Sequence, residues 1–235
     1  LERCVEILGE ISGASDDAED LRSVCNEFIT RLTGQQTIYQ MLHLRREVQA
    51  RGGVPLSAQA YKADYLDRLH QEIAPRLAAL RARRASPSEY LVPGSFDLLG
   101  GLRDRDVTCY LASGTDQPLV EEEAALLELA PYFEGGIHGA QEAYWTFSKK
   151  KLIASIIADT QLKGREIVVF GDGYVEIENG SEVGAVTVGI AGLETGDGGW
   201  DERKRARLLE VGAQILVPDW READELLAYL YGEDL

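Results

Sequence analysis

The stretch IVVFGDGYVEIE, residues 167–178, changes abruptly from apolar to glycine and acidic residues. The β-branched and aromatic side chains of 167–170 predict a buried strand. This strand would end at the GDG of 171–173, and Glu176 would follow at the start of a helix. Because ligands bind at the carboxyl ends of strands in α/β sheets, we expect Asp172 and Glu176 to face a crevice there.

The chemistry of these two residues suits a metal. Asp172 and Glu176 are hard oxygen ligands of the kind that Mg²⁺ takes from proteins. Gly173 would let the backbone turn sharply or come close to a ligand. By itself, the same pattern also fits an ordinary strand, a glycine turn and a solvated acidic helix start, so the interpretation depends on the rest of the chain.

The composition excludes several classes of function. The 235 residues are 45% hydrophobic and carry a net charge of −16, a balance that disfavours binding to nucleic acid or to anionic membranes. A small phosphate ester can still bind beside a metal or a local cation. No apolar run approaches the ~20 residues of a membrane span, and no secretory leader is recognisable. We therefore expect a cytoplasmic protein with no membrane partner, whose oligomeric state the sequence does not reveal.

The cysteines do not predict a metal or disulfide framework. Cys4, Cys25 and Cys109 are widely spaced, without a CxxC pair or a Cys/His ligand pattern. We expect them to be reduced thiols in the core. The three histidines do not pair in sequence with a convincing Ser or Cys nucleophile, so a serine-type triad has little support.

Two regions differ in their periodicity. Residues 1–90 have helical spacing throughout and predict an all-helical domain, with Pro75 inside its longest helix. Residues 91–235 alternate strands and helices, which predicts an α/β domain with a doubly wound, parallel, Rossmann-like sheet. The expected strands of this domain cover 107–112, 136–139, 167–170, 185–190 and 214–217.

Two further segments could bind phosphate. The strand VTCYLA is followed by Ser113, Gly114 and Thr115, whose amides and hydroxyls could hold phosphate oxygens; an ordinary turn is the alternative. Three lysines open the helix at 149–160, where positive charge opposes the helix macrodipole and suggests a nearby anion. Lys149 can reach inward over the apolar face of this helix, whereas the other two lysines would be solvated.

Taken in order, Ser113, Lys149 and Asp172 with Glu176 resemble the second, third and fourth motifs of the haloacid dehalogenase superfamily of phosphohydrolases. The resemblance covers roughly residues 90–220 and is closest to phosphoglycolate phosphatase-like members with a helical cap. It implies that Ser113, with Gly114 and Thr115, binds the phosphoryl oxygens and that Lys149 neutralises charge. It also implies that Asp172, helped by Glu176 through water, anchors Mg²⁺, and that residues 1–90 form the cap.

The first motif of that family, an apolar strand ending in DxDxT, is not found in this sequence. Residues 104–108, DRDVT, fit the letters but precede a strand instead of following one; we interpret them as a charged turn. The resemblance implies that the nucleophile strand lies upstream of Leu1 and is the central strand of the sheet. Without it, the sheet would have two unpaired interior edges.

The helical region offers weaker specificity candidates. The polar break RLTGQQTIYQ at 31–40 separates two helices, and caps of this family often direct such a segment at the substrate. Gln35, Gln36 and Arg45 are therefore candidate substrate contacts, although solvation at the surface would explain each of them.

These observations favour a Mg²⁺-dependent phosphatase of a small phosphorylated metabolite, such as a sugar phosphate or phosphoglycolate. The reaction would pass through an aspartyl-phosphate on an upstream aspartate. The alternative is a catalytically silent module that binds phosphate or a partner and lacks the nucleophile. A dehalogenase or phosphomutase on the same scaffold is less favoured, because the acidic pair suits metal and phosphate.

Overall fold

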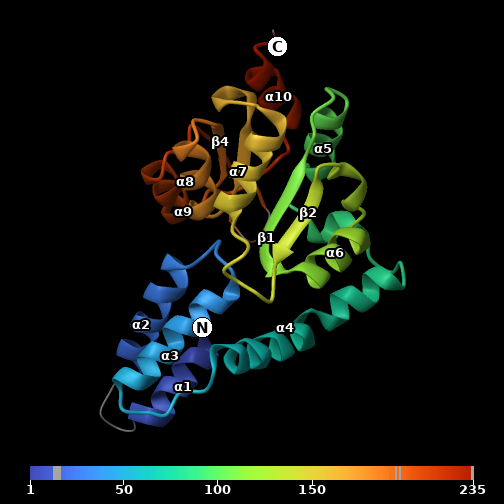
Figure 1. The fold of residues 1–235 in the computed structure, drawn as a ribbon. Helices are drawn as coiled ribbons and strands as arrows, with labels where there is room; N and C mark the ends of the chain where they lie inside the picture. The colour runs from blue at the N-terminus through green and yellow to red at the C-terminus, as the bar shows by residue number, and fades with distance from the viewer. Residues whose placement is uncertain (13–16, 194, 196, 234–235) are drawn as a thin grey trace. The chain divides into compact units, whose positions relative to one another are not determined.

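The computed structural model describes residues 1–12, 17–193, 195 and 197–233 (Figure 1). It divides the chain into two compact units, Leu1–Pro75 and Arg76–Leu235. The sequence suggested a division near residue 90, whereas the units divide inside a long helix. Residues that follow Pro75 belong with the second unit, where Arg81 forms an ion pair with Glu122.

The first unit is built from helices, and no strand occurs among its described residues. The helices are α1 (Glu2–Ser12), α2 (Ala18–Arg31), α3 (Thr37–Ala50) and the first part of α4 (Ala58–Arg81). The first three pack on one another around fully buried side chains, among them Leu8, Phe28 and Leu44. The ring of Phe28 also stacks on that of His43, with 4.7 Å between centroids. This arrangement agrees with the helical periodicity of the sequence.

The second unit alternates strands and helices, which confirms the predicted α/β class. Its helices are α5 (Ser95–Arg103), α6 (Gln117–Leu126), α7 (Lys149–Thr160), α8 (Tyr174–Glu182), α9 (Glu202–Glu210) and α10 (Ala223–Tyr231). Its strands are β1 (Tyr110–Asp116), β2 (Gly136–Ala140), β3 (Val168–Gly171), β4 (Val186–Ile190) and β5 (Ile215–Val217). Short 3₁₀ turns occupy Pro87–Tyr90, Ala130–Tyr132 and Gly164–Glu166. None of the helices described is both long and apolar enough to cross a membrane.

The strands are parallel but form two sheets. One sheet has the order β1-β2 and the other β3-β4-β5. Among the described strands, β1 pairs only with β2 and β3 only with β4, so each has one edge without a strand partner. The described strands therefore form two separate sheets and not one continuous sheet.

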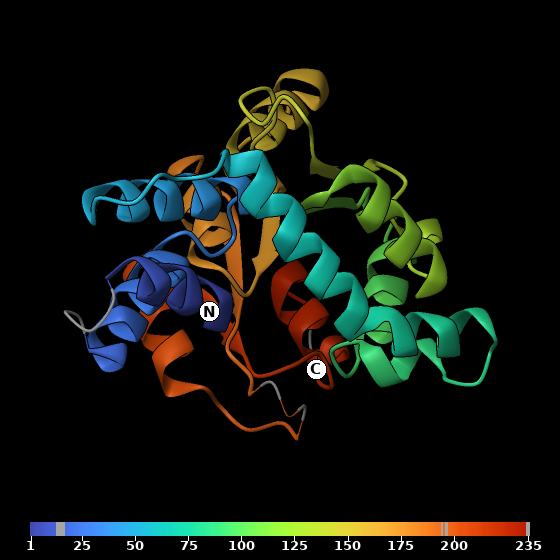
Figure 2. The ribbon, with the colours of Figure 1, turned by 90° about the horizontal axis from the view of Figure 1, so that it is seen from below.

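The three-stranded sheet is covered on both faces, as a doubly wound fold requires. Alternate residues of a strand point to opposite faces. On one face Val168, Phe170 and Val188 pack in a cluster with residues of α5 and α10. On the other face α8 packs on β3 and β4, and α9 packs on β4. Figure 2 shows α10, in red, beside α5, in green; both helices cover the same face of the sheet.

The cysteines lie in the structure as expected for core thiols. Cys4 and Cys25 are buried, Cys109 is half-buried, and all three are free. Burial disfavours the thiolate, and it raises the pKa of Cys25 to about 11. Burial raises the pKa of Cys4 and of Cys109 as well.

The packing of α10 leads to a stability prediction. Leu227 is 0% exposed in the cluster between this helix and the sheet, whereas Tyr229 on the same helix is 71% exposed. Leu227→Ala should lower the free energy of unfolding by about 2–5 kcal/mol through lost burial and a cavity. Tyr229→Ala should change it by less than about 1 kcal/mol. Urea unfolding followed by circular dichroism measures both; equal losses would contradict the assigned core.

Candidate active site

The segment Ser113–Thr115 lies on an irregularity of β1. The sequence placed the strand at 107–112, ending before Ser113, but the observed strand runs from Tyr110 to Asp116. Pairing begins at Tyr110 because β2 begins opposite it, at Gly136. The register then shifts after Ala112, so that the next paired residue is Asp116. Residues 113–115 therefore form a bulge, a feature that redirects side chains and backbone groups next to active sites.

Local hydrogen bonds hold this bulge. The hydroxyl of Ser113 accepts a hydrogen bond from the N–H of Thr115 at 3.1 Å. Gln117, at the start of α6, donates through Nε2 to the carbonyl of Ile137 at 2.8 Å, and its Oε1 accepts from the N–H of Gly139. Gln117 thereby joins the carboxyl ends of β1 and β2. Sequence reasoning missed this residue, whose role depends on the pairing of two strands.

Lys149 lies at the start of α7 and points inward. Ser148 caps this helix by accepting a hydrogen bond from the N–H of Lys151. The side chain of Lys149 is only 10% exposed and forms an ion pair with Glu176, which is 14% exposed. Lys150 instead forms an exposed pair with Glu182. The inward orientation of Lys149 and the outward orientation of Lys150 are those the sequence suggested.

The GDG segment makes room for Glu176. This carboxylate folds back from the first turn of α8 onto the end of β3, as expected. A Cβ added at Gly171 would lie 2.9 Å from the Cβ of Glu176, and one added at Gly173 would lie 2.4 Å from its Oε2. A side chain at either position would therefore displace the carboxylate of Glu176 from the end of β3. The buried Oε2 of Glu176 has no hydrogen-bond partner among the described residues.

Asp172 lies between these glycines and is open to solvent. Its side chain is 67% exposed, and its Oδ2 is 3.8 Å from the Nζ of Lys204 on α9. Lys204 was missed in the sequence. A signal was present, since Lys204 belongs to the basic run RKRAR at 203–207 in an acidic chain. Like the lysines of α7, it also lies in the first turn of a helix, where a cation is disfavoured.

Asp172 and Glu176 can be compared as ligands of Mg²⁺, an ion that binds oxygen atoms and keeps several waters in its coordination shell. Asp172 fits, because its carboxylate is accessible. Glu176 is placed differently: one of its oxygens is paired with Lys149 and the other is buried. In the described part of the chain, no three acidic, His or Cys side chains gather as a metal site. Of the two expected ligands, Asp172 is thus better placed for direct coordination.

The candidates of the helical unit remain predictions. Gln36 precedes α3 and is buried, so solvation at the surface does not explain it. Gln35 is half-buried and Arg45 is exposed. These three belong to Leu1–Pro75, whereas the other candidates belong to Arg76–Leu235.

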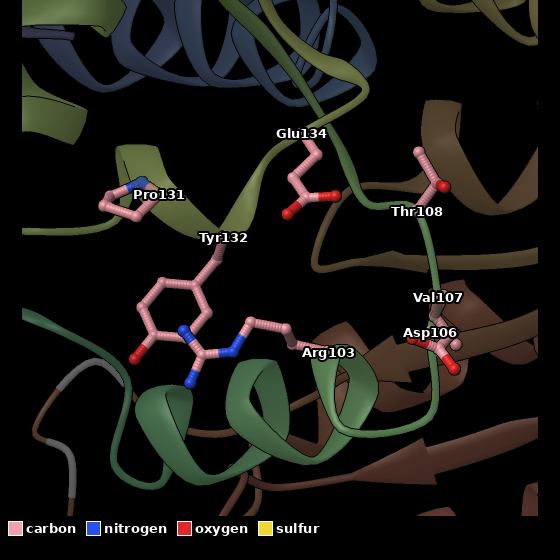
Figure 3. A pocket seen from close by; sticks show the side chains of 7 residues that line it. All are labelled: Arg103, Asp106, Val107, Thr108, Pro131, Tyr132 and Glu134. Atoms are coloured by element: carbon pink, nitrogen blue, oxygen red, sulfur yellow. The ribbon is translucent and has the colours of Figure 1, made fainter.

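The segment DRDVT, residues 104–108, forms a turn between α5 and β1, as interpreted from the sequence. Asp106 and Thr108 help to line a cavity of about 150 Å³ at the amino-terminal end of β1. Figure 3 shows the guanidinium of Arg103 against the ring of Tyr132 in this cavity, 4.9 Å from the ring centroid. Asp106 therefore lies before the strand and away from the Ser113 bulge.

Solved structures with the same fold include several hydrolases. A HAD hydrolase of family IA, variant 3, from Entamoeba histolytica HM-1:IMSS has a TM-score of 0.58 at 17% identity, covering 98% of this chain and 91% of that chain. A conserved haloacid dehalogenase-like protein of unknown function from Agrobacterium tumefaciens str. C58 has a TM-score of 0.57 at 17% identity, covering 97% and 91%. A HAD family hydrolase from Deinococcus radiodurans R1, with bound phosphate and sodium, has a TM-score of 0.53 at 17% identity, covering 97% and 89%.

These likenesses establish the fold, and the sequence itself establishes the family. Comparison with curated proteins gives no match. A family model described as a haloacid dehalogenase-like hydrolase matches residues 10–184, well over half of the chain. The match includes the Ser113 bulge, Lys149 and the segment from Asp172 to Glu176. On this evidence the chain belongs to the haloacid dehalogenase-like hydrolases.

Proposed function

We propose that this protein is a Mg²⁺-dependent phosphatase of small phosphorylated metabolites, of the sugar phosphate or phosphoglycolate type. The observation that carries the proposal is the largely buried pair of Lys149 and Glu176 beside the open carboxylate of Asp172. A lysine held inward at a helix start suits the charge of a phosphoryl group. The phosphate in the Deinococcus radiodurans relative is in keeping with such a substrate.

Each residue of the α/β unit has a role in this proposal. The hydroxyl of Ser113 and the amides of Gly114 and Thr115 would hydrogen-bond the phosphoryl oxygens. Lys149 would neutralise their charge, and Glu176 would keep Lys149 in place. Asp172 would hold Mg²⁺, which supplies charge stabilisation to the transferring phosphoryl group.

The nucleophile is assigned to none of residues 1–235. In the proposed reaction, an aspartate attacks phosphorus and the alcohol leaves; water then hydrolyses the acyl phosphate to free the aspartate and phosphate. A strand bearing this aspartate could pair with the open edges of β1 and β3, which supports the proposal. Residues 1–90 would act as a cap over the substrate, with Gln35, Gln36 and Arg45 as candidate contacts, and we expect the protein to act in the cytoplasm.

Asp172→Asn tests the metal assignment. In the intact protein, it should abolish Mg²⁺-dependent phosphate release from a panel of phosphate monoesters, because a neutral amide is a poor ligand for a hard cation. Unfolding should remain cooperative, since the side chain is 67% exposed. Full activity in the variant would refute the assignment. An unmodified protein that binds inorganic phosphate without turnover would favour the silent module.

Lys149→Ala, compared with Lys150→Ala, tests the role of the inward-directed cation. Both changes remove one lysine from an ion pair at the start of α7, but only Lys149 is directed inward. Lys149→Ala should lower kcat about 10²–10³-fold, as the loss of other electrostatic contacts to a transition state does. Lys150→Ala should leave kcat close to that of the unmodified protein. An equal effect of both variants, or an effect of Lys149→Ala on melting temperature alone, would argue against this role.

A further inference from the structure

Helix α9 contacts the Asp172 segment through two side chains one turn apart. The Nζ of Lys204 lies 3.8 Å from the Oδ2 of Asp172. The guanidinium carbon of Arg207 lies 5.6 Å from the ring centroid of Tyr174. Residues three apart share one face of a helix, so this face of α9 lies against Asp172 and the start of α8.

Hydrogen bonds at the start of α9 fix the backbone position of Lys204. Asp201 caps α9 and accepts hydrogen bonds at 3.0 Å from the N–H groups of Arg203 and Lys204. The side chain of Lys204 is 22% exposed, against 67% for that of Asp172. Lys204 is therefore a largely covered cation beside an open carboxylate, and for Asp172 it is the one charged partner among the described residues.

We propose that Lys204 is the counter-cation of Asp172 and weakens the binding of Mg²⁺ to this carboxylate. Lys204 thereby sets the Mg²⁺ concentration that the protein needs. The proposal rests on the assignment of Asp172 as a metal ligand above. Binding of Mg²⁺ to Asp172 would weaken the attraction between this carboxylate and Lys204. The ammonium group of Lys204 would also repel the bound ion. Both effects weaken the binding of the metal, and neither requires a change of fold.

Calorimetric titration of Mg²⁺ into the full-length protein, without substrate, tests the proposal. Lys204→Met should tighten binding about three- to tenfold, as expected for the loss of a partly exposed charge near the ion. Arg205→Met is the matched control, because it removes the same charge from the next residue, whose partners are Glu202 and Trp200. This control should change the Kd less than about twofold, since distant exposed charges are screened. Lys204→Gln provides a second neutral variant with the same expected gain.

The outcomes separate this proposal from the assignment of the metal ligand. Asp172→Asn should abolish Mg²⁺ binding, and Lys204→Arg, which keeps the charge, should bind as the unmodified protein does. An unchanged or weaker affinity in both neutral variants, with binding still dependent on Asp172, overturns the role of Lys204 alone. If neither the unmodified protein nor the neutral variants bind Mg²⁺, both proposals are overturned.

Discussion

The largely buried ion pair between Lys149 and Glu176 is the interaction on which the rest of the site depends. Removing either partner would leave the other charged group buried without compensation, which costs about 3–5 kcal/mol. The pair also explains the local sequence. Gly171 and Gly173 leave the space that the carboxylate of Glu176 occupies, and Ser148 fixes the start of the helix that carries Lys149. Strand end, glycine loop and two helix starts are thus joined by one contact.

Much of the fold could be predicted from local signals. The bounds of α7 agree with the sequence analysis, because its helical periodicity begins after a clear capping signal, Ser148. Strand starts were harder to predict. The apolar run at 107–112 has high strand propensity, but pairing begins where β2 provides a partner. The bulge in β1 has no sequence signature, since an irregular register exists only between two strands.

The sequence indicated candidate residues for the site, but it did not indicate the contacts that these residues make. Lys149 opens α7 and Asp172 follows β3, and such positions can be predicted from a pattern, whereas Ser113 lies inside β1 and not after it. The partner of each charge could not be read in this way. Glu176 looked like a metal ligand and is paired with Lys149, and Lys204 approaches Asp172 from a helix much later in the chain. Periodicity describes one element at a time, whereas these contacts depend on how elements pack.

The interrupted sheet has a consequence for local motion. Strand β4 has hydrogen-bonded neighbours on both sides, while β1 and β3 each have a neighbour on one side only among the described strands. Backbone amides exchange their hydrogens with solvent when local structure opens, and elements with fewer partners open at lower free energy. Amides of β4 should therefore keep their hydrogens longest, and those directed to the open edges of β1 and β3 should lose them first. The α/β unit thus has a slowly exchanging centre at β4, and the strands that carry Ser113 and lead to Asp172 lie in its more readily opened part.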